Sequence, residues 1–168
     1  MKILVLNCGS SSIKYKLYDM TDHSVMAQGG IEKIGLPGSF LKMTLPDGTK
    51  KIIEEDIPEH TKGVQFIFHI LTDPELGALK SLEELGAVGH RMVHGGEKFN
   101  QSVLLTPEVL EAFTACNDLA PLHNPANLKG RKCVSASAFD SPGGRIRPQP
   151  SIRRCPTMLY VCPALRDV

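Results

Sequence analysis

The chain has 168 residues, of which 42% are hydrophobic, so it is long and apolar enough for one domain with a buried core. A formal net charge of +1 gives no general reason to expect nucleic acid or a membrane surface as a partner. No apolar stretch approaches the roughly 20 residues of a membrane-spanning helix, and the five cysteines follow neither a disulfide nor a zinc pattern. We therefore expect a cytoplasmic protein with reduced thiols.

The average charge hides two different kinds of sequence. Residues 1–130 hold 12 basic and 16 acidic side chains, whereas residues 131–168 hold 7 basic and 2 acidic ones. Five of the 12 prolines and three of the five cysteines also lie in residues 131–168. Prolines at that density exclude a long helix and a central strand. We predict one domain over residues 1–130, followed by an irregular or disordered tail over residues 131–168.

The opening of the chain predicts an antiparallel meander. An apolar run over residues 2–7 and an alternating apolar and polar run over residues 13–19 flank a Gly-Ser-Ser-Ser turn, which is the pattern of a hairpin. Further strands are predicted over residues 24–34, 40–45 and 50–53, and a Pro-Asp-Gly turn separates the last two.

After the meander the hydrophobic spacing becomes helical. Apolar residues recur three and four positions apart over residues 64–71, whereas residues 87–93 predict a buried strand. Thr106 and Pro107 are a cap and a first helical residue, and Asn124 looks like the start of another helix. Strands first and helices afterwards argue for a mixed α/β domain.

The turn at residues 7–14 (Asn-Cys-Gly-Ser-Ser-Ser-Ile-Lys) has a composition suited to phosphates on Mg²⁺. Its glycine lets backbone N–H groups point at one anion, while Ser10 and Ser12 add hydroxyl donors. Lys14 adds a positive charge, and Asn7 offers an oxygen for a metal. The spacing is not that of a Walker A loop. An ordinary Gly/Ser hairpin turn explains the composition about as well.

The second segment of interest spans residues 89–96 (Gly-His-Arg-Met-Val-His-Gly-Gly). Arg91 lies inside an apolar strand, which is costly for a charged group unless it faces an anion such as a carboxylate or phosphate. A structural salt bridge is the alternative. His90 and His94 have the spacing of a zinc-protease pair, but the glutamate between them is missing, so we exclude that function. Each histidine could equally be a hydrogen-bonded core residue.

The third segment spans residues 119–127 (Leu-Ala-Pro-Leu-His-Asn-Pro-Ala-Asn). Its two prolines fix a loop around His123 and Asn124 that runs into a helix. Loops at the ends of regular elements are where functional residues concentrate. For Asn124, a role as helix cap is the simpler explanation.

These three segments, in this order, resemble the acetate, propionate and butyrate kinases of the acetokinase family, with acetate kinase the closest match. The resemblance covers about residues 1–130. It implies a ribonuclease H-like α/β fold, shared with actin and the sugar kinases, in which two such domains clamp a nucleotide. It also implies reversible phosphoryl transfer from ATP to acetate, giving ADP and acetyl phosphate, and assembly as a homodimer.

The resemblance implies roles for the first segment. Asn7 would bind Mg²⁺, and Lys14 would lie at the phosphates of ATP together with Ser10 and Ser12.

For the other two segments it implies substrate contacts. Arg91 would bind acetate or the acyl phosphate, and Val93 and Leu122 would form part of a small apolar pocket for the acetate methyl group. His123 would lie near the transferring phosphoryl group and is the one candidate catalytic residue.

The match stops after residue 130. The catalytic aspartate, a second substrate arginine and a stabilising histidine of the family have no counterpart, and the surroundings of Asp140 give only a superficial echo of the family's Phe-Asp-Thr-Ala-Phe-His strand. Residues 150–159 can be encoded by a set of synonymous codons that, in another reading frame, spells Phe-His-Gln-Thr-Met-Pro-Asp-Tyr-Ala. The family has this sequence just after its catalytic aspartate. We therefore interpret the tail as a frameshifted reading of an acetate kinase gene.

We expect such a chain to be inactive in turnover. The alternatives are a non-catalytic domain that binds phosphate or acyl phosphate and a fragment of a propionate or butyrate kinase. A basic tail acting as a nucleic-acid arm is disfavoured, because the tail lacks interleaved aromatic residues and any recognised module.

Overall fold

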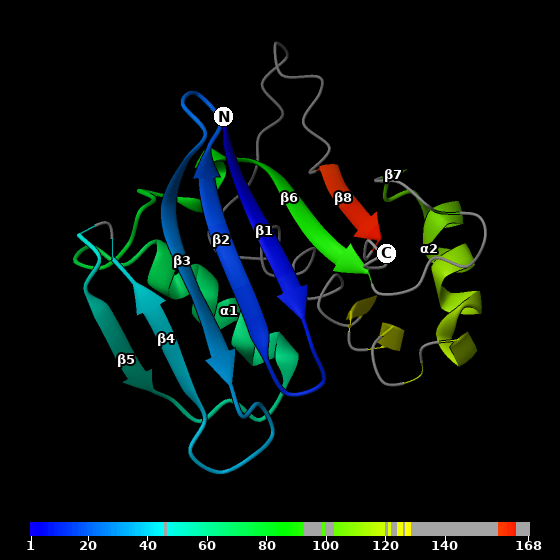
Figure 1. Cartoon of the computed structure of the whole chain (residues 1–168), viewed down its shortest axis with the longest axis horizontal. Helices are drawn as coiled ribbons and strands as arrows, with labels where there is room; N and C mark the ends of the chain where they lie inside the picture. The colour runs from blue at the N-terminus through cyan, green and yellow to red at the C-terminus, as the bar shows by residue number, and fades with distance from the viewer. Residues whose placement is uncertain are drawn as a thin grey trace, which may run out of the picture.

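The structure is a computed structural model that describes residues 1–45, 47–92, 99, 103–119, 121, 124–125, 127–128 and 158–163. One mixed β-sheet dominates it (Figure 1). The antiparallel meander comprises β1 (Lys2–Cys8), β2 (Ile13–Asp19), β3 (Ser24–Glu32), β4 (Phe40–Thr44) and β5 (Lys50–Glu54). The strand order is β5-β4-β3-β2-β1-β6-β8-β7.

The second half of the sheet begins with a crossover. Helix α1 (His60–Leu71) and a 3₁₀ turn at Leu82–Glu84 lead from β5 to β6 (Leu85–Met92), which pairs in parallel with β1. β7 (Val103–Leu104) pairs with β8 (Met158–Pro163), which in turn pairs in parallel with β6. Helix α2 (Pro107–Ala115) and a 3₁₀ turn at Asn117–Leu119 lie at this end of the sheet (Figure 1).

Alternation along the strands decides which face of the sheet is buried. Leu4, Leu6 and Cys8 of β1 pair with Leu17, Tyr15 and Ile13 of β2, and all six are buried in one cluster that includes the apolar face of α1. The intervening residues of the same strands point to the opposite face, since side chains alternate with a period of two. That second face, called the open face here, carries exposed residues such as Val5, Lys14 and Lys16.

Most of the predicted elements are confirmed. The five strands of the meander, α1 and β6 occur within a few residues of the predicted ranges. Thr106 caps α2 by accepting a hydrogen bond from the backbone N–H of Val109 at 3.3 Å, and Pro107 is the first helical residue. Within the described residues no helix is long and apolar enough to cross a membrane.

The tail differs from the prediction at one place. We expected residues 131–168 to be irregular, but Met158–Pro163 form β8. Its proline is the last residue of the strand, so no proline interrupts the apolar run before it. The free edge of β6 offers unpaired N–H and C=O groups that an extended apolar run can satisfy. The other tail residues lie outside the described part of the chain.

Candidate functional site

The β1–β2 hairpin places the first predicted segment at the carboxyl end of β1. Asn7 pairs with Lys14 across the two strands, and both point to the open face, where Lys14 is exposed. The loop closes through a hydrogen bond from the Gly9 backbone N–H to the Ser12 carbonyl at 2.8 Å. That N–H is therefore satisfied within the hairpin. Ser10 is exposed at the loop tip, which leaves its hydroxyl accessible to a ligand.

Packing around Gly9 is tight inside this loop. A Cβ atom at Gly9 would lie 3.2 Å from the Ser12 Oγ, closer than most real Cβ contacts. The Ser12 hydroxyl therefore lies against the backbone of Gly9, on the inner side of the turn.

Arg91 reaches the same face from the neighbouring strand. Leu6 pairs with His90 across β1 and β6, so the next residue on each strand, Asn7 and Arg91, points to the open face. Lys14, Asn7 and Arg91 thus lie on three adjacent strands at the same end of the sheet. In such a row the two cations can donate to the oxygen atoms of an anion, and the amide oxygen can coordinate the metal ion that accompanies it.

The sequence interpretation of Arg91 needs one correction. We expected a charged group buried within an apolar strand, but Arg91 is exposed and the buried polar residue of β6 is His90. The apolar residues of β6 point to the α1 side, whereas Arg91 lies on the open face. Its charge therefore stays in contact with solvent and is available to a ligand.

His90 is enclosed on the buried side of β6. One ring nitrogen, Nδ1, lies 2.8 Å from the Arg91 carbonyl, whereas Nε2 has no hydrogen-bond partner among the described residues. Burial lowers the pKa of His90 from its ordinary 6.5 to about 4, and the hydrogen bond to the carbonyl opposes this shift. His90 is therefore neutral at physiological pH, with Nδ1 as the donor, and forms part of the support behind Arg91.

Two side chains from distant parts of the sequence hold the carbonyl groups next to the β1–β2 loop. His60, the first residue of α1, places Nε2 2.7 Å from the Gly9 carbonyl. The Nδ2 group of Asn127 donates to the Cys8 carbonyl. Two successive carbonyl groups are therefore fixed from the α1 side and from the third predicted segment.

The third segment is thus brought to the first. Asn124 and Asn127 are both fully buried, and both have helical backbone conformation. The Asn124 Nδ2 donates to the Cys116 carbonyl at 3.2 Å, which ties this segment to the end of α2. This bond leads out of the helix that contains Asn124. Val93, Leu122 and His123 lie outside the described residues, so their predicted roles stay predictions.

The described residues fit Mg²⁺ only as a metal that arrives with phosphates. Mg²⁺ is commonly held by one or two protein oxygens together with phosphate oxygens and water. Asn7 supplies one such oxygen, and the described residues include no cluster of three or more His, Cys, Asp or Glu side chains that could hold a metal unaided. A single amide oxygen would suit a metal ion whose other ligands come from phosphate and water.

Sequence reasoning missed the supporting residues. Nothing in the pattern around His60 distinguishes it from an ordinary first residue of a helix. Asn127 belongs to a segment that was singled out, but its bond to Cys8 spans 119 positions and has no local signal. The register between β1 and β6, which are far apart in sequence, also has no local signal. It is this register that brings Asn7 and Arg91 together.

Comparison with known proteins gives one consistent family. A sequence model described as the acetokinase family matches residues 2–142. The acetate kinase of Bacteroides thetaiotaomicron is 76% identical over 136 residues, which are 81% of this chain and 34% of that protein. The acetate kinase of Phocaeicola vulgatus is 75% identical over the same shares of both chains. The chain therefore spans about a third of the length of the curated relatives it matches.

Solved structures agree with the sequence comparison. The crystal structure of Porphyromonas gingivalis acetate kinase matches with a TM-score of 0.83 and 52% identity, over 96% of this chain and 36% of that one. A propionate kinase from Francisella tularensis matches with a TM-score of 0.71 and 34% identity, over 80% of this chain and 33% of that one. The predicted fold class, that of the acetate and propionate kinases, is confirmed.

Proposed function

Because this chain belongs to the acetokinase family, we propose that it carries the phosphate- and acetate-binding part of an acetate kinase. The reaction is reversible phosphoryl transfer from ATP to acetate, giving ADP and acetyl phosphate. The observation that supports this most is the row formed by Lys14, Asn7 and Arg91 on adjacent strands of the open face. Each residue type in that row matches one demand of the reaction.

Phosphoryl transfer demands positioning and charge neutralisation more than covalent chemistry by the protein. Arg91 holds the acetate carboxylate. One oxygen of that carboxylate then bonds to the terminal phosphorus of ATP as the bond between this phosphorus and the leaving ADP oxygen breaks. Lys14, Ser10 and Ser12 bind phosphate oxygens, and Asn7 contributes an oxygen ligand to Mg²⁺. When bound with the nucleotide, the metal neutralises phosphate charge.

We further propose that this chain alone does not turn over, because its sequence has no match to the family's catalytic aspartate and second substrate arginine. The test is to incubate the purified chain with ATP, Mg²⁺ and acetate and to trap acetyl phosphate as its hydroxamate. No product above the blank is expected. ATP-dependent product at a rate proportional to the protein concentration would contradict the proposal.

Binding without turnover is the second candidate function, and the exposed Arg91 favours it. Calorimetry with acetyl phosphate should show binding that weakens by about 1.5–3 kcal/mol, or about 10- to 150-fold, in Arg91→Ala. The matched control is Arg91→Lys, which keeps the charge but loses the two-pronged contact, so its affinity should lie between the two. Equal affinity in all three proteins would refute a role for Arg91.

The choice of acyl group is a separate proposal. Val93 and Leu122 would line a pocket that fits a methyl group, which favours acetate, whereas the likeness to a Francisella propionate kinase keeps the longer acids in consideration. Acetyl and propionyl phosphate should be compared in the same calorimetric assay. Tighter binding of propionyl phosphate would overturn the assignment to acetate. Homodimer formation and a cytoplasmic location are proposed from the family alone.

A further inference from the structure

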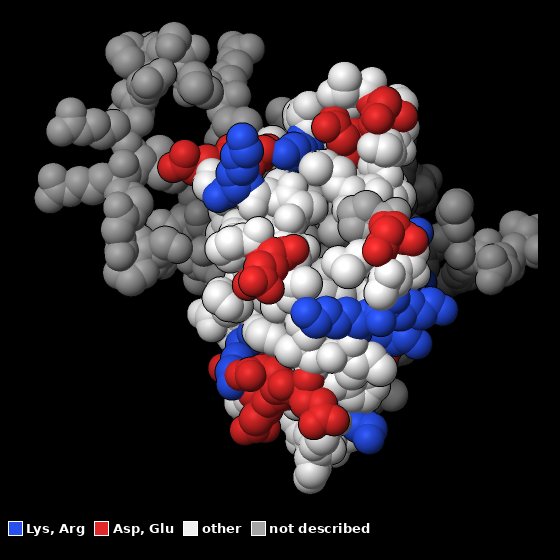
Figure 2. Space-filling model, turned by 90° about the vertical axis from the view of Figure 1, so that its left-hand side faces the viewer, with Lys and Arg blue, Asp and Glu red and all other residues white. Residues whose placement is uncertain are grey.

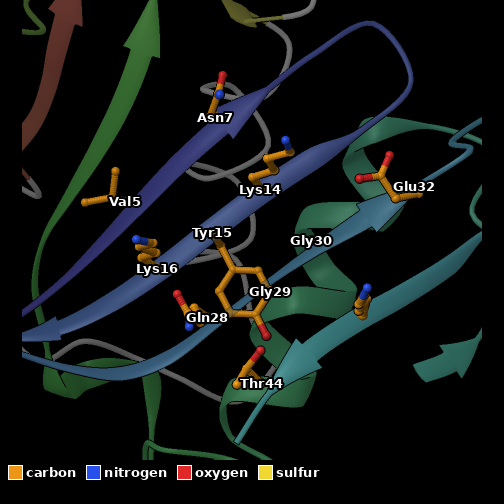
Figure 3. Close-up of a pocket in the computed structure, with 11 residues that line it drawn as sticks. Val5, Asn7, Lys14, Tyr15, Lys16, Gln28, Gly29, Gly30, Glu32 and Thr44 are labelled. Atoms are coloured by element: carbon orange, nitrogen blue, oxygen red, sulfur yellow. The ribbon is translucent and has the colours of Figure 1, made fainter. Parts of the chain in front are cut away.

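A shallow hollow lies on the open face, and its lining includes Asn7 and Lys14 of the row described above. It has a volume of about 420 Å³, which is within the range of small-ligand pockets. Figure 3 shows its side chains around Gly29 and Gly30 of β3. Its main polar lining residues are Lys14, Lys16, Gln28, Glu32, Lys42 and Thr44.

The strand register creates this hollow. Lys14 pairs with Gly30, and Gly30 pairs with Lys42, so the two lysines flank a position that has no side chain. Their strands are two spacings apart, about 9–10 Å, which lets both ammonium groups converge above Gly30. A Cβ atom at Gly30 would lie 3.5 Å from the Lys14 Cγ, so any larger residue would fill the gap.

The next row of the sheet adds neutral donors and a third cation. Lys16 pairs with Gln28, and Gln28 pairs with Thr44. Glu32 lies on β3 on the other side of Gly30 and is the one acidic residue in the lining. The hollow is therefore polarised, with a carboxylate at one end and Lys16, Gln28 and Thr44 at the other.

Among the described residues, no lysine around the hollow forms a salt bridge. The two salt bridges of the described residues join Lys2 to Glu84 and Lys62 to Glu55, both elsewhere in the molecule. Burial raises the pKa of Tyr15 beneath Gly29 to about 12, so its hydroxyl stays neutral and offsets no charge. Three ammonium groups facing one hollow repel one another, and an anion between them relieves that repulsion.

Charge is distributed differently in the hollow and on the neighbouring edge of the sheet. Seen from the β5 edge, acidic and basic side chains share the surface, with acidic ones both below and above a band of basic ones (Figure 2). Solvated faces usually mix the two signs in this way. In the lining of the hollow, by contrast, three lysines accompany a single carboxylate, that of Glu32.

We propose that this hollow binds a small phosphate-bearing anion through Lys16 and Lys42, with Gln28 and Thr44 donating hydrogen bonds. The anion lies at the end of the hollow that is remote from Glu32. Asn7 and Lys14 line this hollow and also belong to the row that contains Arg91, but the four residues that would hold the anion lie outside that row. The proposal therefore does not depend on the function proposed above.

The test is calorimetric titration of the full chain with pyrophosphate at low ionic strength. The double variant Lys16→Ala/Lys42→Ala should bind at least tenfold more weakly than the parent. The matched control is Lys50→Ala/Lys51→Ala, which removes the same charge from β5 outside the hollow and should stay within twofold. Circular dichroism verifies that both variants keep the fold.

Three outcomes would overturn the proposal. One is no binding of pyrophosphate by the parent chain, and another is an equal loss in both double variants, which would mean that net charge alone matters. The third is a loss in Arg91→Ala as large as that in the hollow variant, since pyrophosphate would then occupy the Arg91 row. Failure of acetyl phosphate binding together with intact pyrophosphate binding would count against the proposed function alone.

Discussion

Two neighbouring residues of β6 experience opposite environments. His90 is buried among apolar side chains, whereas Arg91 is exposed on the other face of the same strand. The carbonyl of Arg91 accepts the hydrogen bond from the His90 ring, so the backbone that carries the candidate ligand-binding arginine is fixed by the buried histidine. A change at His90 therefore acts on Arg91 through the strand, without any contact between the two side chains.

The buried His90 predicts a pH dependence of stability. Its pKa is about 4 in the folded chain and near 6.5 when unfolded. Between these values the unfolded state binds a proton that the folded state does not, so the free energy of unfolding is highest above pH 6.5 and falls as the pH drops toward 4. The loss is at most about 3 kcal/mol, because one pKa unit corresponds to about 1.4 kcal/mol.

Urea unfolding between pH 4.5 and 7.5 measures this loss. The control is His90→Gln, which keeps a polar side chain but does not titrate, so its unfolding midpoint should vary much less over the same range. A parent and variant with the same pH profile would show that His90 does not carry the effect.

His60 predicts an effect on the loop that it contacts. His60→Phe keeps an aromatic ring but removes the bond to the Gly9 carbonyl, which should cost about 0.5–1.5 kcal/mol. The local consequence is faster exchange of the Gly9 amide hydrogen, which is bonded to the Ser12 carbonyl, measured by NMR. His69→Phe is the matched control, since His69 is exposed on the same helix and has no described hydrogen bond through its side chain. Exchange accelerated equally by both changes would rule out a specific role of His60.

At the scale of elements, glycines on different strands of the sheet differ sharply in the space around them. A Cβ atom at Gly29 would lie 2.5 Å from the Lys42 carbonyl oxygen and 2.9 Å from the Tyr15 ring. At Gly89 the nearest atom would be the Val5 Cγ2, at an ordinary 3.6 Å. The close approach of β2, β3 and β4 beneath the hollow therefore depends on Gly29.

The two glycines predict opposite outcomes for the same substitution. Gly29→Ala should destabilise the chain by about 1–3 kcal/mol, because a backbone oxygen and a buried ring must move. Gly89→Ala should be neutral or stabilising by up to about 1 kcal/mol, because alanine loses less conformational freedom on folding. Thermal unfolding of both variants measures the difference. A Gly29→Ala variant as stable as the parent would show that β3 can shift at no cost.

The elements that could be predicted from the sequence are those set by local pattern. The alternation of Ile13, Tyr15 and Leu17 with lysines defines β2, and Thr106 with Pro107 defines the start of α2. Pairing between distant strands has no such local signal. The parallel register of β6 on β1, which creates the Lys14–Asn7–Arg91 row, depends on how α1 packs the crossover onto the sheet. The burial of Arg91 was wrongly predicted for the same reason, since a run of apolar residues does not show which face is covered.

At the scale of the whole molecule, β8 and the sequence of the tail must be explained together. β8 lies between β6 and β7 and pairs with both, although the prolines of the tail led us to exclude a central strand there. Sheet edges accept any extended run that has few charges and no internal proline. The run at residues 158–163 meets that condition whatever its origin. The strand is therefore compatible with a tail that is not encoded in the family's reading frame.

The composition change after residue 130 predicts what the encoding DNA contains. A shift of frame explains together the excess of basic residues, the prolines and the cysteines of the tail. Codons for residues 150–159 that also spell Phe-His-Gln-Thr-Met-Pro-Asp-Tyr-Ala in another frame are unlikely to arise by chance, because Met158 has a single codon and Cys155 has two. Residues 144–147 similarly allow Val-Val-Phe-Asp in the remaining frame, which is weaker support.

Sequencing of the DNA across codons 128–168, read in all three frames, tests this prediction. We expect a second frame that encodes Phe-Asp-x-Ala-Phe-His-Gln-Thr-Met-Pro and continues into a long open frame. Restoring that frame should yield a protein that forms acetyl phosphate from ATP and acetate, which is trapped as its hydroxamate. The present chain should not form it. If no such frame exists, the tail is native sequence, and phosphate or acyl-phosphate binding by this domain becomes the leading function.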